Sequence, residues 1–133
     1  MSTFWDRVAW LYDLVERSNR AVNTAAAART AQLVPAGARV LDCAAGTGEF
    51  SLAAAKRAGT VLCTDQSQAM LKQARKKAKK RGLTNITFSR RDVTALSDPD
   101  GSFDAVIAAN VLHLLPQPEA AVRELWRVTA PGG

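Results

Sequence analysis

The sequence contains little of what builds disulfide, metal or membrane-spanning structures. It has two cysteines and one histidine among its 133 residues. Two cysteines are too few for a disulfide framework, and a single histidine does not complete a metal site with them. No apolar run reaches the roughly 18 residues that a membrane-spanning helix needs. The composition therefore predicts a domain that is held together by an apolar core.

Length and amino-acid usage fit one globular domain. Hydrophobic residues make up 47% of the chain and charged residues 23%, which is typical of a chain that folds rather than one that stays disordered. Residues 1–16 mix charged with aromatic side chains, unlike a signal or transit peptide. Cys43 and Cys63 fall in apolar segments, so we expect them to be small core residues. A cytoplasmic protein is the expectation from these features.

Apolar spacing and turn residues predict strands that alternate with helices. Helices are expected at 3–15, 21–33, 50–58 and 67–81 and from Pro118 onward, the last with Val122, Leu125 and Trp126 facing inward; strands are expected at 39–43, 60–65, 85–89 and 103–109. This alternation favours an α/β domain, a parallel sheet with helices on both faces. The chain is divided into N-terminal helices at 1–36 and an α/β core at 37–133.

A glycine-containing loop follows the first predicted strand. Gly46 and Gly48 stand where the chain must turn from strand to helix, and glycine permits the backbone angles of such a turn. In open parallel sheets, ligands bind beyond the carboxyl ends of the strands. A dinucleotide and a nucleoside with a charged amino-acid tail both fit this geometry. The dinucleotide fingerprint needs a third glycine where this chain has Ser51, so that match is incomplete.

Acidic residues mark the ends of the first three predicted strands. Asp42 directly precedes the glycine loop, where its carboxylate can order the loop or lie near an ammonium group. Asp65 ends the second strand, 17 residues after Gly48, and can accept hydrogen bonds from two ribose hydroxyls. Asp92 follows the third strand, where it can accept from an adenine amino group while Val93 lies against the ring. Together these features form a more specific signal than any one of them.

The motifs resemble those of the class I S-adenosylmethionine-dependent methyltransferases, in particular the ubiquinone/menaquinone C-methyltransferase group. Segment 40–48 resembles the D-x-G-x-G-x-G motif of the family. Ala44 replaces its first glycine, at little cost if the backbone angles there are ordinary. Further resemblances cover nearly the whole chain: 5–13 to the lid helix, 64–71 to D-x-S-x-x-M-L, 91–93 to the third motif, 102–107 to S-F-D-x-V, and 125–133 to L-x-R-V-x-x-P-G-G.

The resemblance implies a Rossmann-like three-layer sandwich with strand order 3-2-1-4 and S-adenosylmethionine as the cofactor, without a metal. The loop at 46–48 is expected to hold the methionine part and Asp65 the ribose. Asp92 and Val93 are expected to hold the adenine, and Asn110 is expected to lie beside the sulfonium or methionine end. Tyr12 is expected to close over the cofactor. The full set of implied cofactor-binding residues is Tyr12, Asp42, Ala44, Gly46, Thr47, Gly48, Asp65, Gln66, Met70, Asp92, Val93 and Asn110.

The implied activity is methyl transfer to a small-molecule acceptor by in-line displacement. Such a reaction needs a base only where the acceptor must lose a proton. His113 is a candidate base, although its leucine neighbours favour a packing role. The family fold has seven strands, so the chain is expected to lack the last of them. If it is complete, we expect a homodimer through the apolar fourth strand.

Other functions stay open at this point. Seven cations within 72–81 suggest an RNA methyltransferase as an alternative. A solvated helix face explains these cations more simply, and no aromatic residues interleave with them for base stacking. A non-catalytic module that binds the cofactor or a partner is a second alternative. A dehydrogenase is a more remote one.

Overall fold

The computed structural model describes residues 4, 6–9, 20–109 and 111–133. Residues 4 and 6–9 are helical, as expected for the start of the helix predicted at 3–15. Two residues implied in cofactor binding, Tyr12 and Asn110, lie outside the described residues. No helix among the described residues is long and apolar enough to cross a membrane.

The described chain alternates helices and strands in the predicted order. The elements are α2 (Arg20–Leu33), β1 (Arg39–Asp42), α3 (Glu49–Ala54), β2 (Thr60–Asp65), α4 (Gln68–Lys80), β3 (Ile86–Arg90), β4 (Ala105–Ile107), the 3-10 helix η1 (Leu112–Leu114) and α5 (Pro118–Val128). Two elements are shorter than predicted by more than two residues: α3 ends four residues before the expected helix end, and β4 covers only the middle of 103–109.

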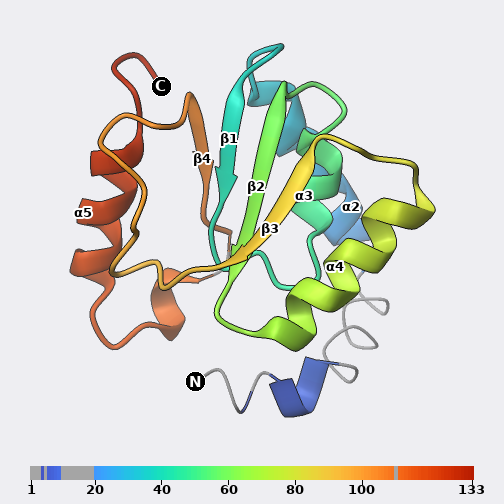
Figure 1. The fold of residues 1–133 in the computed structure, drawn as a ribbon, viewed down its shortest axis with the longest axis horizontal. Coiled ribbons are helices and arrows are strands. Elements are labelled where there is room, and N and C mark those ends of the chain that lie inside the picture. Colours follow the sequence, from blue (N-terminus) through green and yellow to red (C-terminus); the bar gives the residue numbers. More distant parts are fainter. Residues whose placement is uncertain (1–3, 5, 10–19, 110) are drawn as a thin grey trace.

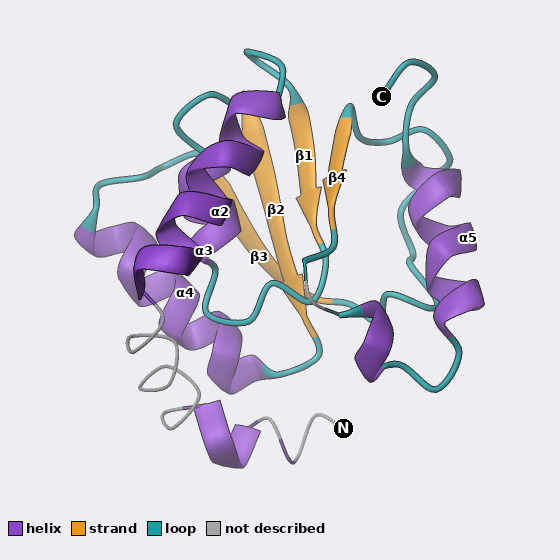
Figure 2. Cartoon of the chain, turned by 180° about the vertical axis from the view of Figure 1, so that it is seen from behind, coloured by secondary structure: helices purple, strands orange, loops and turns teal. Residues whose placement is uncertain are grey.

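The strands form one parallel sheet in the order β3-β2-β1-β4, which confirms the predicted topology. Helices α2, α3 and α4 lie on one face of this sheet, and α5 lies on the other (Figures 1 and 2). In the register, Asp42 of β1 stands opposite Cys63 of β2 and Ile107 of β4. The carboxyl ends of the strands therefore meet at one edge of the sheet.

Side chains alternate between the two faces of each strand, as a sheet covered on both sides requires. Val40 and Val61 belong to the apolar cluster beneath α2 and α3. Leu41 and Cys43 belong to the cluster on the α5 side. Cys63 packs beneath α4 in a third cluster. Both cysteines are free and buried, which confirms their predicted core role.

The side chains of α5 that face the sheet differ from those predicted. Val122 is 49% exposed and Trp126 is 84% exposed, so the prediction that they face inward is wrong. The fully buried residues are Ala121 and Val128, and Leu125 packs beside them. Ala121 and Val128 lie two helical turns apart, and a small residue on the buried stripe allows the helix to approach the sheet closely.

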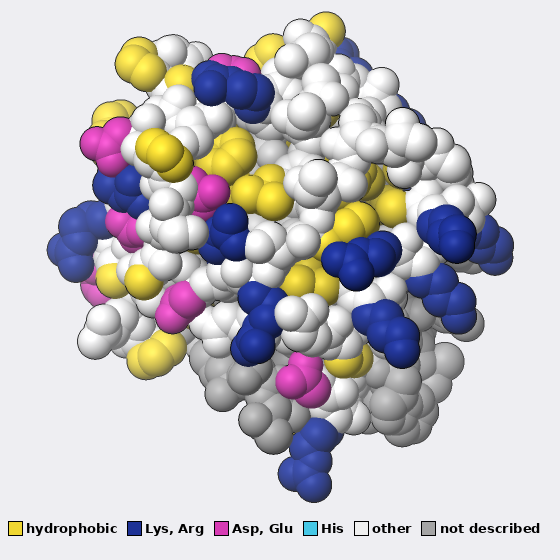
Figure 3. All heavy atoms as spheres, viewed as in Figure 1, with side chains coloured by type: hydrophobic (Ala, Val, Ile, Leu, Met, Phe, Trp, Pro, Cys, Tyr) yellow, Lys and Arg dark blue, Asp and Glu magenta, His cyan; other side chains and the backbone are white. Residues whose placement is uncertain are grey.

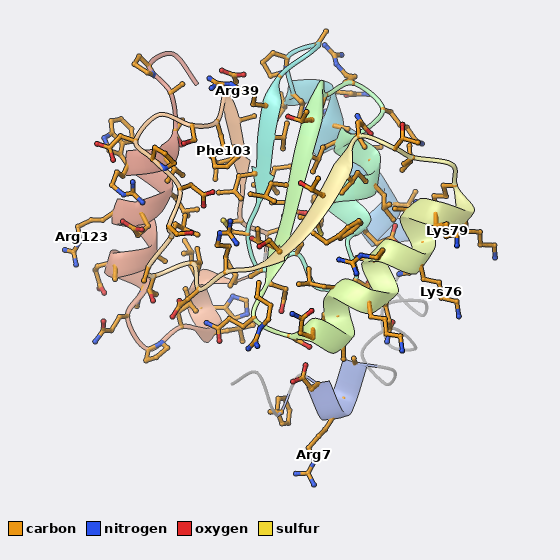
Figure 4. All side chains as sticks on the ribbon, viewed as in Figure 1. Arg7, Arg39, Lys76, Lys79, Phe103 and Arg123 are labelled. Atoms are coloured by element: carbon orange, nitrogen blue, oxygen red, sulfur yellow. The ribbon has the colours of Figure 1, made fainter. Side chains whose placement is uncertain are left out.

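The opposite edge of the sheet, at the start of β1 and β4, is joined by an ion pair. The Arg39 backbone N–H and guanidinium both donate to the Asp104 carboxylate, at 2.9–3.1 Å. Arg39 is labelled at this edge in Figure 4. The side-chain charges at this end are therefore satisfied between neighbouring strands, away from the carboxyl edge.

Candidate functional site

The glycine loop has the backbone that a sharp strand-to-helix turn requires. Gly46 and Gly48 have φ values of 58° and 87°, in the region that L side chains rarely adopt. A Cβ built on Gly48 would lie 2.8 Å from the Cβ of Ala74 in α4. Gly48 is therefore needed both for the turn and for the close approach of the loop to α4.

Ala44 has an unfavourable backbone conformation. Its φ of 52° makes it the one non-glycine residue with a positive φ in the described part of the chain. An L-residue in this region costs roughly 1–2 kcal/mol because its Cβ crowds the following carbonyl oxygen. The condition under which alanine was expected to cost little, an ordinary backbone angle, is therefore not met. This backbone conformation favours glycine, which is the residue at this position in the D-x-G-x-G-x-G motif.

Asp65 joins the glycine loop to the start of α4. Its Oδ2 accepts a hydrogen bond from the Gly46 N–H and its Oδ1 accepts one from the Ser67 N–H, each at 2.9 Å. Burial raises the pKa of Asp65, while these N–H donors oppose that rise. A carboxylate accepts about four hydrogen bonds, so both oxygens keep capacity for further donors such as ribose hydroxyls.

Asp42 is almost completely buried beneath the loop, with 1% of its surface exposed. The Ser51 hydroxyl donates to its Oδ2 at 2.7 Å. The pKa of Asp42 is raised to about 7, mainly by burial and in smaller part by the charge of nearby Asp65, while the hydrogen bonds from Ser51 oppose the rise. Ser51 stands at the position of the missing third glycine. Ser51 therefore supplies a hydrogen bond to Asp42 that a glycine at this position, as in the dinucleotide fingerprint, would not supply.

Asp92 is exposed and is held within its own turn. Its Oδ1 accepts from the Thr94 hydroxyl at 2.6 Å and from the Thr94 N–H at 2.9 Å. These bonds lower the pKa of Asp92, and a hydrogen bond from the Gln66 side chain contributes to the lowering. The structure therefore brings together Gln66 and Asp92, two predicted adenosine residues, from the ends of neighbouring strands.

Helix α5 clamps the segment that follows Asp92. Arg127 donates to the Leu96 carbonyl at 2.9 Å and the Asp98 carbonyl at 2.8 Å. Glu124 accepts from the Leu96 N–H at 2.6 Å and also pairs with Arg127. The sequence does not predict these contacts, because a charged residue on a helix is most often solvated. The one sequence feature that points to Arg127 is its place in the L-x-R-V motif at 125–128.

The N-terminal helical residues reach the same edge through Asp6. The Ser67 hydroxyl donates to the Asp6 Oδ1 at 2.5 Å and accepts from the Met70 N–H at 3.2 Å. Ser67 is fully buried and is the N-cap residue of α4. Figure 1 shows the N-terminal helical residues beside the first turn of α4. The Asp6 contact had no sequence signal that could have identified it.

The remaining predicted residues differ in exposure. Thr47, Met70 and Val93 are buried, with 3%, 2% and 5% of their surfaces exposed. Thr47 lies in the glycine loop, Met70 in the first turn of α4, and Val93 packs beside Leu41. His113 is exposed in η1, so the expected packing role is wrong. Its role as a base stays a prediction.

The sequence profile described as Methyltransferase domain matches residues 40–133 of this chain. The chain belongs to this family. It is 45% identical over 100 residues to the ubiquinone/menaquinone biosynthesis C-methyltransferase UbiE of Bdellovibrio bacteriovorus. That match covers 74% of this chain and 42% of the relative, so the chain spans less than half the length of that protein.

Solved structures share the fold of this methyltransferase domain. An S-adenosylmethionine-dependent methyltransferase from Aquifex aeolicus superposes with a TM-score of 0.67 at 27% identity, covering 74% of this chain and 54% of that one. The [4+2]-cyclase SpnF superposes with a TM-score of 0.73 at 35% identity, covering 83% of this chain and 41% of that one. S-adenosylmethionine is the cofactor of the family, and the fold also occurs in a protein named for another reaction.

Proposed function

We propose that this methyltransferase domain binds S-adenosylmethionine at the carboxyl edge of its sheet and transfers the methyl group to a small-molecule acceptor. The observation that carries the proposal is the position of Asp65. One carboxylate holds the glycine loop and the start of α4 and keeps acceptor capacity on both oxygens. A ribose diol needs such a rigid, partly free carboxylate.

The other residues at the edge divide between the two ends of the cofactor. The adenine amino group is assigned to Asp92, beside Gln66. The methionine part is assigned to the backbone of loop 46–48, with the buried Asp42 carboxylate near its ammonium group. The fit rests on the donor and acceptor chemistry of this edge, where buried carboxylates need cationic or hydroxyl partners.

The bound cofactor would supply an electrophilic methyl group and a neutral thioether leaving group. The chain's own contribution is then to bind and orient, since a well-aligned displacement needs little more than proximity and exclusion of water. The Asp6–Ser67 contact holds the N-terminal helical residues near Asp65, the carboxylate proposed to bind the ribose. His113 is proposed as a base only for acceptors that must lose a proton.

For the acceptor, we propose a quinol-type aromatic compound as the first to test. The support is the name of the Bdellovibrio relative, a ubiquinone/menaquinone C-methyltransferase. The RNA alternative is supported only by the cations of α4. Cytoplasmic localisation, the division at residue 36 and a homodimer through β4 stay predictions.

A second candidate function is a reaction other than methyl transfer. The observation that favours it is the similarity to the cyclase SpnF, which shares the fold at 35% identity. In that case the domain would bind the cofactor or its product without turning it over.

One pair of measurements separates these candidates. Calorimetric titration with S-adenosylmethionine tests binding, and formation of S-adenosylhomocysteine with demethylated quinols and other phenolic acceptors tests transfer. We expect binding in the micromolar range and acceptor-dependent product. Binding without product across the acceptors would favour the second candidate, and a folded chain that does not bind would contradict both.

A further inference from the structure

The cations of this chain are distributed unevenly. Segment 66–91, which contains α4 and β3, holds nine of the 18 Lys and Arg residues and none of the 12 Asp and Glu residues. The rest of the chain therefore has more acidic than basic side chains, although the net charge of the whole is +6. The positive field of the molecule comes from one helix–strand unit.

The cations of α4 form an exposed face. The helix buries Met70, Leu71, Ala74 and Ala78 against the sheet. Its exposed lysines, which we call the lysine face, are Lys72, Lys76, Lys79 and Lys80. Lys76 and Lys80 follow Lys72 at steps of four, and Lys79 lies three residues after Lys76, so the four lie along one side of the helix. Lys and Arg side chains gather over α4 in Figure 3, and Lys76 and Lys79 point away from the body in Figure 4.

The lysine face has no partner within the described part of the chain, unlike its neighbours. Lys77 and Arg81 share the Glu49 carboxylate, at 3.2 and 3.8 Å. The Arg75 guanidinium lies over the ring of Phe88, 5.3 Å from its centroid. No ion pair or hydrogen bond joins the four lysines of the face to another described residue. Like charges one helical turn apart destabilise a helix slightly. Lys79 and Lys80 lie in the last turn of α4, where the helix dipole favours cations, but Lys72 and Lys76 have no such role in the fold.

We propose that the lysine face docks this domain on the surface of an anionic lipid bilayer. Each lysine near such a surface strengthens binding about fivefold, and four on one helix face act together. A site for single-stranded RNA typically has aromatic side chains on which the bases stack. Phe88 is the sole aromatic residue of segment 66–91, and Arg75 covers it. The face therefore suits a partner that offers charge alone. This inference does not depend on methyl transfer.

Vesicle sedimentation tests the proposal with the intact chain. The probes are vesicles of one part phosphatidylglycerol to two parts phosphatidylcholine, and vesicles of phosphatidylcholine alone. We expect binding only to the anionic vesicles, with release as salt is raised. The variant Lys72→Gln/Lys76→Gln/Lys79→Gln should bind roughly 100-fold more weakly. Glutamine keeps the helix propensity, and a thermal melt checks that the variant is folded.

A matched control removes the same charge elsewhere. The variant Arg29→Gln/Lys56→Gln/Arg123→Gln changes three exposed cations outside the lysine face, and it should keep most of the binding. Equal losses in the two variants would show that net charge, not this face, binds the lipid and would overturn the proposal. So would absence of binding to anionic vesicles, or RNA binding that displaces the vesicles and needs the same lysines.

Discussion

The ends of β2 and β3 each present a carboxylate to the proposed cofactor edge, but they hold it differently. Asp65 is partly buried, and its two oxygens accept N–H groups from two separate segments, at Gly46 and Ser67. Asp92 is exposed, and its turn contact is to Thr94, two residues away. The first carboxylate organises its surroundings, while the second is part of a local turn.

This difference shows where rigidity in the site originates. The backbone around Asp65 is fixed by the carboxylate itself, at the centre of the loop and α4. The segment after Asp92 is fixed from a distance, by Glu124 and Arg127 of α5. Asp65 is therefore expected to dominate cofactor affinity, and Asp92 to contribute a smaller, adenine-specific part.

The largest expected effect comes from removing the organising carboxylate. Asp65→Ala removes the acceptor for the ribose and leaves the Gly46 and Ser67 N–H groups without their partner. Hydrogen bonds to charged groups are worth about 1.5–3 kcal/mol each, so affinity for S-adenosylmethionine should fall about 100-fold or more. Calorimetric titration measures this. Asp92→Ala should lose less than tenfold by the same measurement.

Asp104→Ala is the control for this pair of variants, because it removes a carboxylate from the opposite edge of the sheet. It should leave the affinity of the folded protein unchanged. If Asp65→Ala and Asp92→Ala weakened binding equally, the distinction between the two strand ends would be wrong.

The buried Asp42 at the end of β1 and the exposed Asp92 after β3 should also differ in their response to pH. Burial raises the pKa of Asp42 to about 7, whereas the Thr94 bonds lower that of Asp92. The positively charged cofactor favours ionised Asp42, so affinity should fall as the pH drops through about 7, by up to tenfold per pH unit. Titrations across this range should give a flat profile for Asp42→Asn. A wild-type profile that is equally flat would argue against this role.

In the free protein, Asp42 should affect stability in the opposite direction. Its folded pKa lies above its unfolded value, so the fold favours the protonated form. This contribution to the free energy of unfolding is fully present below the unfolded pKa and is lost as the pH rises through about 7. Denaturant titrations of wild type and Asp42→Asn separate it from the other carboxylates.

The clamp from α5 can be released without touching the proposed site. Arg127→Met removes the donors to the Leu96 and Asp98 carbonyls, and affinity for S-adenosylmethionine should weaken by a factor of roughly three to ten. Discrimination against an analogue that lacks the adenine amino group should fall as well, which a purely structural role would not predict. Asp100→Ala, which removes one contact to an 83% exposed carboxylate, should change neither. Unchanged discrimination in Arg127→Met would contradict the positioning role.

The smallest effect concerns the loop beside Asp65. Ala44→Gly should stabilise the fold by about 1 kcal/mol, because glycine adopts the φ of 52° without the Cβ clash. Ala45→Gly is the matched control. Its φ is not positive, so glycine there should destabilise through added freedom of the unfolded chain. Chemical denaturation of both variants gives the comparison. A destabilised Ala44→Gly would show that the loop is not strained.

The sequence was sufficient for those features that a short segment decides alone. The order of strands and helices followed from apolar periodicity, and the positive φ of Gly46 and Gly48 followed from a turn between strand and helix. The strand ends placed Asp42, Asp65 and Asp92 at one edge, because parallel strands end at the same side of a sheet. These are local or topological properties, and the motif resemblance agreed with them.

Other features depended on contacts between segments far apart in the chain. The Ser67–Asp6 hydrogen bond, the burial of Ala121 instead of Trp126, and the exposure of His113 have no local sequence signal. The L-x-R-V motif marks Arg127 but does not say that its partner is the Leu96 carbonyl. Each depends on the rotation and distance at which two elements pack. The sequence by itself thus determined the fold and which strand ends carry carboxylates. Only the tertiary structure decided how firmly each carboxylate is held, because that depends on which donors the packing brings to its oxygens.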